Sequence, residues 1–485
     1  MSSADPDSPP VAIPPYPAVS SLGTLASDLT IAEVAGDAGR FTDYSVPDAG
    51  IRALYTTESI WQSWLDVEVA LARAEAEVGI VPEDAARRIA QVGRLSHLDR
   101  EKVIAGMRVQ GHPLVPLIEE LAEAAGDGAG GWVHWGATSQ NIMQSGHAIL
   151  IGRAHAIVSR LLLDCLAALA DLAERSATMI MPGRTHGQHA VPITFGLKVA
   201  TWIDDLLRGH DRIEHGVRPC LRVMMAGAVG SFASLGEVGP KVQRRVADLL
   251  GLDPMPVPSR ALLSPQSGYI SDLAIVAASC ARIAIEVETM MQTEFGEVSE
   301  PVPEGSVGSS TMPHKRNPKL SADVLDLAAF VRSTAPEAVA AVIHPHEADG
   351  GATAKLDAAM QNSLVAMGDL LMRLKVILEG LELFPKRMRR NLELSGNLIG
   401  SEAVMLALGE EIGRDEAHRI VYEAAMRCAT EGEDFEGLLV SDPRVIAALP
   451  PARIRQLLDP AGHVGLAPQI AREAARRARD AVAEE

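Results

Sequence analysis

The chain of 485 residues is poor in aromatic side chains and in positive charge. Phe, Trp and Tyr together make up 4% of it, which disfavours a β-sandwich, because strands favour aromatic and β-branched residues. Lys and Arg total 44 against 63 Asp and Glu, so the net charge is −19. A surface this acidic disfavours nucleic acid and anionic membranes as partners, although it admits an anionic substrate in a cleft that gathers a few cations.

The chain also has few cysteines and no long uncharged apolar run. Cys165, Cys220, Cys280 and Cys428 show no paired spacing and lie in apolar helical contexts, so we expect buried reduced thiols and no metal site. No apolar run is long enough to span a bilayer, and the proline-rich residues 1–30 lack the basic start and apolar stretch of a signal peptide. We therefore expect a cytoplasmic protein with a flexible N-terminal tail.

Length and helical periodicity together predict an all-α protein with three helical domains. The chain exceeds what one hydrophobic core usually organises, and its helical patterns run far beyond the usual eleven or twelve residues. Apolar positions on more than one face of these patterns indicate a bundle buried inside an oligomer. The long patterns cover about 142–178, 192–217, 268–296, 319–343 and 354–381. The predicted domains are an N-terminal helical domain at 31–128, a central long-helix bundle at 129–382 and a C-terminal helical domain at 383–485.

The most informative stretch is residues 308–318, which read GSSTMPHKRNP. A glycine followed by two serines gives a loop with hydroxyls and free backbone N–H groups, and Lys315 and Asn317 follow within nine residues. This set suits a carboxylate, because a lysine neutralises it and amides receive the charge that grows on it. The ordinary alternative is a surface turn before a helix that begins near Pro318.

A second polar segment, residues 134–141, reads HWGATSQN and precedes a long helix. Hydroxyls and amides at a helix N-terminus form an anion site, since unpaired N–H groups and the helix dipole point at it. Capping by Thr138 or Ser139 is the simpler alternative, but it explains one hydroxyl and not four consecutive polar side chains. We expect a carboxylate to bind at Thr138, Ser139, Gln140 and Asn141.

A third segment, residues 183–190, reads GRTHGQHA and is expected to be a loop that leads into another long helix. His186 can exchange a proton near neutral pH, and Arg184, Thr185 and Gln188 flank it, which favours an acid/base or orienting role. His112, in the stretch QGHP, is equally compatible with a site residue and with an ordinary polar loop residue.

Together these three segments resemble, in the same order, the three signature regions of the aspartase/fumarase lyase superfamily. The resemblance covers about residues 40–475 and is strongest over 131–318. It implies an all-helical subunit of three domains and a homotetramer whose central domains build one twenty-helix core. It also implies that each active site takes its three segments from three different subunits.

The resemblance assigns roles residue by residue. Ser309 matches the general-base serine, and Lys315 and Asn317 match the residues that hold the carboxylate next to the acidic carbon. Residues 138–141 match the segment that binds substrate carboxylates, and His186 matches the histidine that acts as general acid or positions it. The further expected substrate-binding residues are His112, Arg184, Gln188, Ser310 and Met312.

The implied reaction is a β-elimination from a small substituted succinate that gives fumarate. Removing a proton beside a carboxylate creates a doubly charged aci-carboxylate, so preorganised donors around that carboxylate are expected to be the largest catalytic contribution. Serine is a poor base in water, but dehydration beside Lys315 and backbone amides would favour its alkoxide. No metal or organic cofactor is needed for this chemistry.

Two branches of the superfamily compete for the substrate. The wording SSTMPHK is typical of adenylosuccinate lyases, but Asp43 stands where that branch has a phosphate-holding arginine, and residues 346–351 replace its Ser-Ser-x-Glu-Arg element. The 3-carboxy-cis,cis-muconate cycloisomerase branch matches better, at residues 134–140, 188–196, 231–236, 402–405 and 413–418. In that branch an aspartate is usual where this chain has Asn141.

Nitrosuccinate lyases of biosynthetic pathways resemble the same cycloisomerase branch, and their substrate is our first specific hypothesis. An inactive structural relative and a helical scaffold are the alternatives outside catalysis. Intact Ser309, Lys315, Asn317 and His186 argue against the first, and three polar loops of this wording argue against the second.

Overall fold

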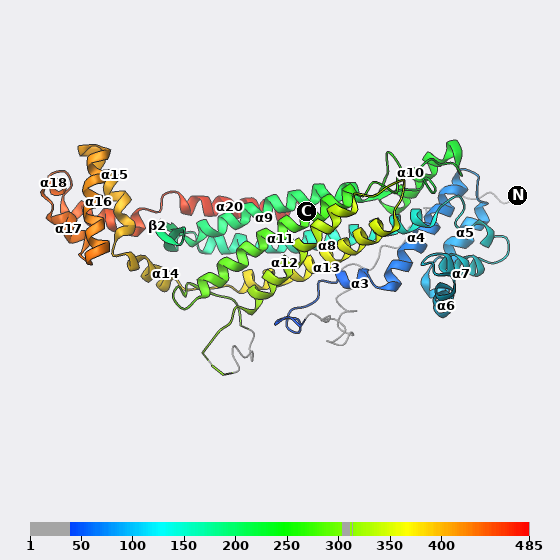
Figure 1. The fold of residues 1–485 in the computed structure, drawn as a ribbon, viewed down its shortest axis with the longest axis horizontal. Coiled ribbons are helices and arrows are strands. Elements are labelled where there is room, and N and C mark those ends of the chain that lie inside the picture. The colour runs from blue at the N-terminus through cyan, green and yellow to red at the C-terminus, as the bar shows by residue number, and fades with distance from the viewer. Residues whose placement is uncertain (1–38, 303–310, 313, 485) are drawn as a thin grey trace. The chain divides into compact units, whose positions relative to one another are not determined.

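The computed structural model describes residues 39–302, 311–312 and 314–484. The described chain is mostly helical, with three small two-stranded sheets, so the predicted all-α class is confirmed (Figure 1). Ser309, Ser310 and the tail predicted at residues 1–30 lie outside the described residues. Within the described ranges, no helix combines the length and the apolarity that crossing a membrane requires.

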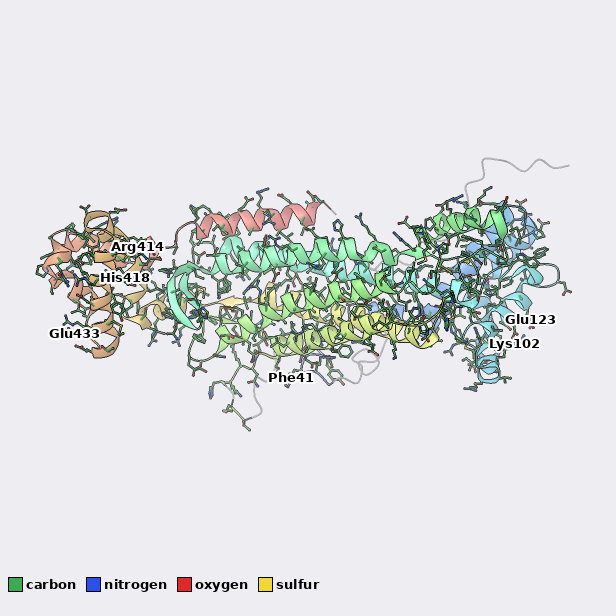
Figure 2. All side chains as sticks on the ribbon, turned by 45° about the horizontal axis from the view of Figure 1, so that its top comes forward. Phe41, Lys102, Glu123, Arg414, His418 and Glu433 are labelled. Atoms are coloured by element: carbon green, nitrogen blue, oxygen red, sulfur yellow. The ribbon has the colours of Figure 1, made fainter. Side chains whose placement is uncertain are left out.

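The chain forms two compact units, and the first comprises the residues up to Ile157 together with Leu221–Arg260. Its core forms where α4 packs against α5 and α10. Its elements are α3 Ile51–Leu54, α4 Thr57–Glu77, α5 Glu83–Val92, η1 Leu95–His97, α6 Arg100–Gln110, α7 Val115–Ala125, η2 Gly130–Trp132, the first part of α8 Ser139–Arg175, β3 Arg222–Val223, η4 Gly236–Val238, α10 Gly239–Leu250 and β4 Asp253–Pro254. An ion pair between Lys102 and Glu123 joins α6 to α7 (Figure 2).

The second unit comprises Val158–Cys220 and Ala261–Glu485. In it α11 packs against α9, α12 and α13, and α20 packs along α9 (Figure 1). Besides the second part of α8 and the shorter helices described below, its elements are β1 Ile180–Thr185, β2 Gln188–Thr194, α9 Phe195–Val217, η3 Arg218–Cys220, α11 Ser264–Met291, β5 Val298–Ser299, α12 Lys319–Ala341, α13 Gly350–Gly380, β6 Glu382–Leu383 and α20 Ala467–Ala483. Each of the five long helical patterns of the sequence corresponds to one of α8, α9, α11, α12 and α13.

The shorter helices from Pro385 onward are α14 Pro385–Leu392, η5 Glu393–Ser395, η6 Leu398–Gly400, α15 Ser401–Ile412, α16 Arg414–Glu431, α17 Phe435–Ser441, α18 Pro443–Ile446, α19 Pro451–Leu458 and η7 Pro460–Gly462. Of these, α15 to α19 enclose a small core of their own, and α14 packs against β1. Arg414 and His418, in one of the stretches that match the cycloisomerase branch, both lie on α16 (Figure 2). The three-domain division stays a prediction.

Residues 180–194 differ from the expected loop, because they form a β-hairpin. β1 pairs with β2 from Ile180 opposite Thr194 to Thr185 opposite Gln188. The two turn residues, His186 and Gly187, have φ angles of 53° and 75°. Positive φ at both central positions is what a two-residue hairpin turn requires, and glycine adopts it without strain.

Candidate functional site

The segment 134–141 leads into α8 through a reciprocal cap. The N–H of Thr138 donates to Oδ1 of Asn141 at 3.1 Å, and the N–H of Asn141 donates to the carbonyl of Thr138 at 2.8 Å. This satisfies one backbone donor ahead of the helix through the side chain three positions on, as a capping box does. Thr138, Ser139 and Gln140 are half-buried, so the predicted carboxylate-binding side chains lie at the helix N-terminus.

The side chain of Asn141 is fully buried, and its amide has protein partners. Nδ2 donates to the carbonyl of Gly227 at 3.2 Å and lies 2.7 Å from Sδ of Met224, while Oδ1 also accepts the N–H of Gly227 at 3.1 Å. Asn141 therefore ties the start of α8 to residues 224–227. Its influence on a bound substrate is expected to be indirect, through the placement of Thr138 and its neighbours.

His112 caps a different helix in the same unit. Its Nδ1 accepts the N–H groups of Leu114 and Val115, each at 3.1 Å, at the start of α7. A ring nitrogen that accepts two N–H groups is unprotonated, so the proton of the neutral ring resides on Nε2. Of the two alternatives that the sequence left open, the described contacts favour the ordinary loop residue.

His186 and Gln188 stand exposed at the end of the β1–β2 hairpin in the second unit. Their exposure fits side chains that meet a substrate. His189, next along β2, is partly buried. Burial and the nearby Arg184 lower the pKa of His189, against the opposite effect of Glu297, so its ring is neutral at pH 7.

Arg184 anchors this hairpin close to its turn, where it pairs with His189. Its guanidinium forms two hydrogen bonds to the carboxylate of Glu297, at 2.9 and 2.7 Å, and lies over the ring of Phe295 at 4.8 Å. Glu297 is fully buried and also accepts from Nδ2 of Asn391 at 2.8 Å. A bidentate pair of this kind is specific in geometry. In the described chain Arg184 thus positions His186 and Gln188, and its predicted contact with substrate stays a prediction.

The described part of the signature loop leaves its polar side chains exposed ahead of α12. Met312, Lys315 and Asn317 are exposed, and the loop is held there by backbone contacts, among them the N–H of Lys315 to the carbonyl of Met312 at 3.0 Å. Ser309 and Ser310 lie outside the described residues, so their roles stay predictions. An exposed lysine beside an exposed carboxamide is what a carboxylate ligand needs.

Glu300 is a functional candidate that the sequence did not reveal. Its side chain is 3% exposed and accepts the N–H groups of Leu320 and Ser321, each at 3.0 Å, and the hydroxyl of Ser321 at 3.0 Å. Burial raises the pKa of Glu300, although these hydrogen bonds oppose the change. One side chain therefore joins the two ends of the segment 301–319. No local pattern reports a contact across twenty residues.

Residues 297–300 connect the hairpin with the signature loop. Arg184 binds Glu297 at one end of this short stretch, and Glu300 binds the first turn of α12 at the other. His112 and the segment 134–141 belong to the first unit, whereas the hairpin and the signature loop belong to the second. Among the described residues, no cluster of three or more His, Cys, Asp or Glu side chains could hold a metal ion.

Comparison with known proteins shows relatives along most of the chain. An adenylosuccinate lyase from Pyrococcus horikoshii is 35% identical over 89% of this chain and 96% of its own length. An N-acetyl-S-(2-succino)cysteine lyase from Dickeya dadantii is 33% identical over 88% of this chain and 94% of its own length. A 3-carboxy-cis,cis-muconate cycloisomerase from Pseudomonas aeruginosa is 37% identical over 86% of this chain and 92% of its own length.

Family and fold comparisons agree with these relatives. Residues 42–332 match the family described as Lyase, and residues 397–474 match the family described as Adenylosuccinate lyase C-terminus. The solved structure of a fumarate lyase from Mesorhizobium sp. BNC1 has a TM-score of 0.83 at 35% identity, over 88% of this chain and 98% of that one. The chain is therefore a lyase of the aspartase/fumarase superfamily, whose chemistry is β-elimination of the succinate type.

Proposed function

We propose that this protein converts nitrosuccinate into fumarate and nitrite. Ser309, as its alkoxide, takes the proton from the carbon beside one carboxylate, and the electron pair passes into that carboxylate as an aci-carboxylate. The pair then returns to form the carbon–carbon double bond while the carbon–nitrogen bond breaks and nitrite leaves. The products are fumarate, nitrite and a proton, so no oxidant, reductant or co-reactant is needed.

The observation that carries this mechanism is the pair of exposed polar side chains ahead of α12. Glu300 already occupies the N–H groups of Leu320 and Ser321, so the helix N-terminus has little left to offer an anion. The charge that neutralises the aci-carboxylate is therefore assigned to Lys315, with Asn317 as hydrogen-bond donor. His186, exposed at the hairpin turn, is assigned as the general acid or its positioner.

Two features of the chain support a small substrate without a phosphate. Asp43 is half-buried, and its Oδ2 accepts the N–H of Arg40 at 2.8 Å, where the adenylosuccinate lyase branch has an arginine. A carboxylate held there opposes a nucleotide phosphate. Asn141 supplies a neutral amide at the position where the cycloisomerase branch has a carboxylate, which favours a leaving group that departs as an anion.

A substrate panel tests the proposal directly. Purified protein is mixed with nitrosuccinate, adenylosuccinate, N-acetyl-S-(2-succino)cysteine or 3-carboxymuconate, and fumarate absorbance and nitrite release are followed. Fumarate and nitrite in equal amounts from nitrosuccinate are expected. Fumarate from adenylosuccinate or N-acetyl-S-(2-succino)cysteine, with no nitrite from nitrosuccinate, would replace the leaving group and keep the β-elimination. Loss of 3-carboxymuconate absorbance without fumarate would instead indicate cycloisomerisation. No turnover of any member would favour an inactive relative.

We also propose a homotetramer whose active sites are shared between subunits. Large apolar side chains on the long helices are exposed in the single chain, which supports burial against other copies. They include Ile275 and Ile285 of α11 and Phe330 and Val339 of α12. Mixing inactive Ser309→Ala with an inactive Thr138→Ala variant should restore part of the activity after subunit exchange. Complete failure, with exchange shown independently, would mean that one chain builds each site.

A further inference from the structure

A cluster of buried ionisable side chains lies beneath the turn that leads to α8. Glu68 and Glu75 stand two turns apart on one face of α4, and their side chains are 2% and 0% exposed. Nδ1 of His134 lies 2.6 Å from Oε1 of Glu68. None of these three residues has a part in the proposed elimination.

The backbone that carries His134 is strained in a way that its surroundings must maintain. His134 has a φ of 62°, and a residue other than glycine keeps such a conformation only where the neighbouring structure determines it. Its side chain is 19% exposed, so the contact with Glu68 is mostly sheltered from water. The hydrogen bond to Glu68 is therefore the side-chain contact that holds this turn residue in place.

The next turn residue is fastened as well. Gly136 has a φ of 66°, and a Cβ atom at this position would lie 2.8 Å from Cδ2 of Leu235 and 3.6 Å from Oε1 of Glu75. The hydroxyl of Ser234 donates to the carbonyl of Gly136 at 2.7 Å. Only Ala137 separates Gly136 from Thr138, so the position of the substrate-binding residues follows that of the turn.

The carboxyl of Glu75 differs from that of Glu68. Within the described residues, neither of its oxygens has a hydrogen-bond partner. Burial, and then the charge of Glu68, raise the pKa of Glu75 to about 8. Burial by itself lowers the pKa of His134, but the hydrogen bond and charge of Glu68 outweigh it, so the pKa of His134 is raised. The cluster therefore holds His134, hydrogen-bonded to Glu68, beside Glu75, whose raised pKa favours its uncharged form at neutral pH.

Two helices, α5 and α10, pack on α4 and have uncharged buried faces. The buried face of α5 consists of Ala85, Ala86, Ile89 and Val92, and that of α10 consists of Gly239, Val242, Gln243, Val246 and Ala247. Arg245 of α10 is directed to Glu77, with Nε 2.8 Å from its Oε2. The charge that acts on the pKa of Glu75 is that of Glu68.

We propose that Glu68 and His134 are positioning residues that hold the 138–141 segment in the position that binding of a substrate carboxylate requires. The inference rests on the proposed function only in assigning substrate binding to that segment. The pair acts through the turn, and neither side chain touches the substrate. When Glu75 loses its proton, its negative charge repels that of Glu68, and this repulsion weakens the hold of the Glu68–His134 contact on the turn.

The test compares variants of the buried and exposed faces of α4 in the full-length enzyme. Glu68→Gln removes the charge that holds His134, and Glu77→Gln, on the exposed side of α4, is the matched control. Glu68→Gln should raise KM and the Kd for fumarate about fivefold or more with a smaller change in kcat, as expected when binding alone is lost. Glu77→Gln should stay within about twofold of wild type. KM and Kd within twofold of wild type in Glu68→Gln would overturn the proposal.

A pH series keeps the inference testable if Glu68→Gln fails to fold. In the wild type, KM should rise as the pH rises through about 8, where Glu75 loses its proton. Glu75→Gln, which keeps a neutral side chain of the same shape, should flatten that rise. An unchanged alkaline rise would overturn the proposal, because a merely structural cluster would alter thermal stability and leave the KM profile alone. Wild-type turnover on the substrate panel is measured first, so failure of the proposed function would be seen separately.

Discussion

Glu75 and Glu300 are both buried glutamates, and each lies near the start of a helix with predicted substrate-binding residues, Glu75 near α8 and Glu300 near α12. Their hydrogen bonding is opposite. Glu300 accepts three hydrogen bonds from the first turn of α12, whereas Glu75 has no hydrogen-bond partner among the described residues. Burial raises the pKa of both, and in Glu300 the hydrogen bonds oppose that change. A buried carboxylate with hydrogen-bond donors can anchor a backbone segment. Burying a carboxyl group that has no such donors costs less free energy when the group is protonated.

The same contrast separates the two predicted substrate-binding regions. Contacts of His134, Gly136 and Asn141 hold the start of α8, where the side chains of residues 138–140 are half-buried. Ahead of α12, Lys315 and Asn317 are exposed, and Glu300 fastens only the ends of their loop. We infer that the first region is prebuilt for binding and that the second carries the chemistry. Substitutions in the two regions should therefore change different kinetic constants.

The largest effect is expected at the proposed base. Ser309→Ala removes the group that takes the proton, so kcat should fall about a thousandfold or more while product binding persists. Steady-state kinetics and the Kd for fumarate check both parts. Activity within about threefold of wild type would contradict the assignment of Ser309 and remove one side of the comparison.

Lys315 should affect kcat as well as KM. The carboxylate that it holds gains charge in the transition state, so Lys315→Ala should cost about 3–4 kcal/mol in kcat/KM, with kcat lowered. Lys319→Ala, at the start of α12, is a suitable control outside the proposed site. A change confined to KM would mean equal binding of substrate and transition state, and would contradict the aci-carboxylate role.

Glu75 predicts a pH-dependent stability. Its pKa is raised from 4.5 to about 8, so between these values the folded state binds a proton that the unfolded state has lost. The free energy of unfolding should therefore fall as the pH rises from about 4.5 to 8, by up to roughly 1.4 kcal/mol per pH unit from this group. In urea unfolding at a series of pH values, Glu75→Gln should show a shallower fall than Glu77→Gln. Equal slopes would mean that Glu75 is ionised in the folded protein.

Much of the fold could be predicted from the sequence, because a long helix repeats apolar residues every three to four positions over many consecutive residues. The five long patterns appear as α8, α9, α11, α12 and α13, with ends that differ by a few residues where caps decide them. Asp349, for example, accepts the N–H of Ala352 at 2.6 Å and begins α13 four residues before the predicted start. The sequence analysis did not predict the hairpin at 180–194, because its strands are short and its polar residues were interpreted as a functional loop.

The site was less predictable, because motif letters do not distinguish a side chain that meets substrate from one that supports it. Arg184 and Asn141 both belong to polar motifs, yet their described partners are Glu297 and residues 224–227, far away in sequence. Glu300 and Glu75 gave no local signal. Their roles come from contacts and burial that only the folded chain creates.

Glu300→Gln tests how firmly the chemical region must be anchored. Glutamine keeps one acceptor oxygen and turns an NH2 group toward an N–H donor, so about 1–3 kcal/mol of stability should be lost. If the anchor also positions Lys315, kcat should fall several-fold beyond the loss of folded protein. Thermal unfolding and active-site titration with a tight-binding inhibitor separate these two effects. Normal kcat in a destabilised variant would limit Glu300 to folding.

Asn141→Asp should give the smallest change in turnover. It tests the nature of the leaving group through the region at the start of α8. Aspartate can still accept the N–H groups of Thr138 and Gly227, but it loses the donor to the carbonyl of Gly227 and brings negative charge to a buried position. The start of α8 should become less favourable for a departing anion, at a cost of about 1 kcal/mol, or roughly fivefold in nitrosuccinate turnover. Comparison with Asn141→Ser, which is neutral and also loses the amide, separates charge from lost hydrogen bonds. Equal losses in the two variants would show that Asn141 acts only through the position of the 138–141 segment, and faster nitrite release by Asn141→Asp would contradict a leaving group that departs as an anion.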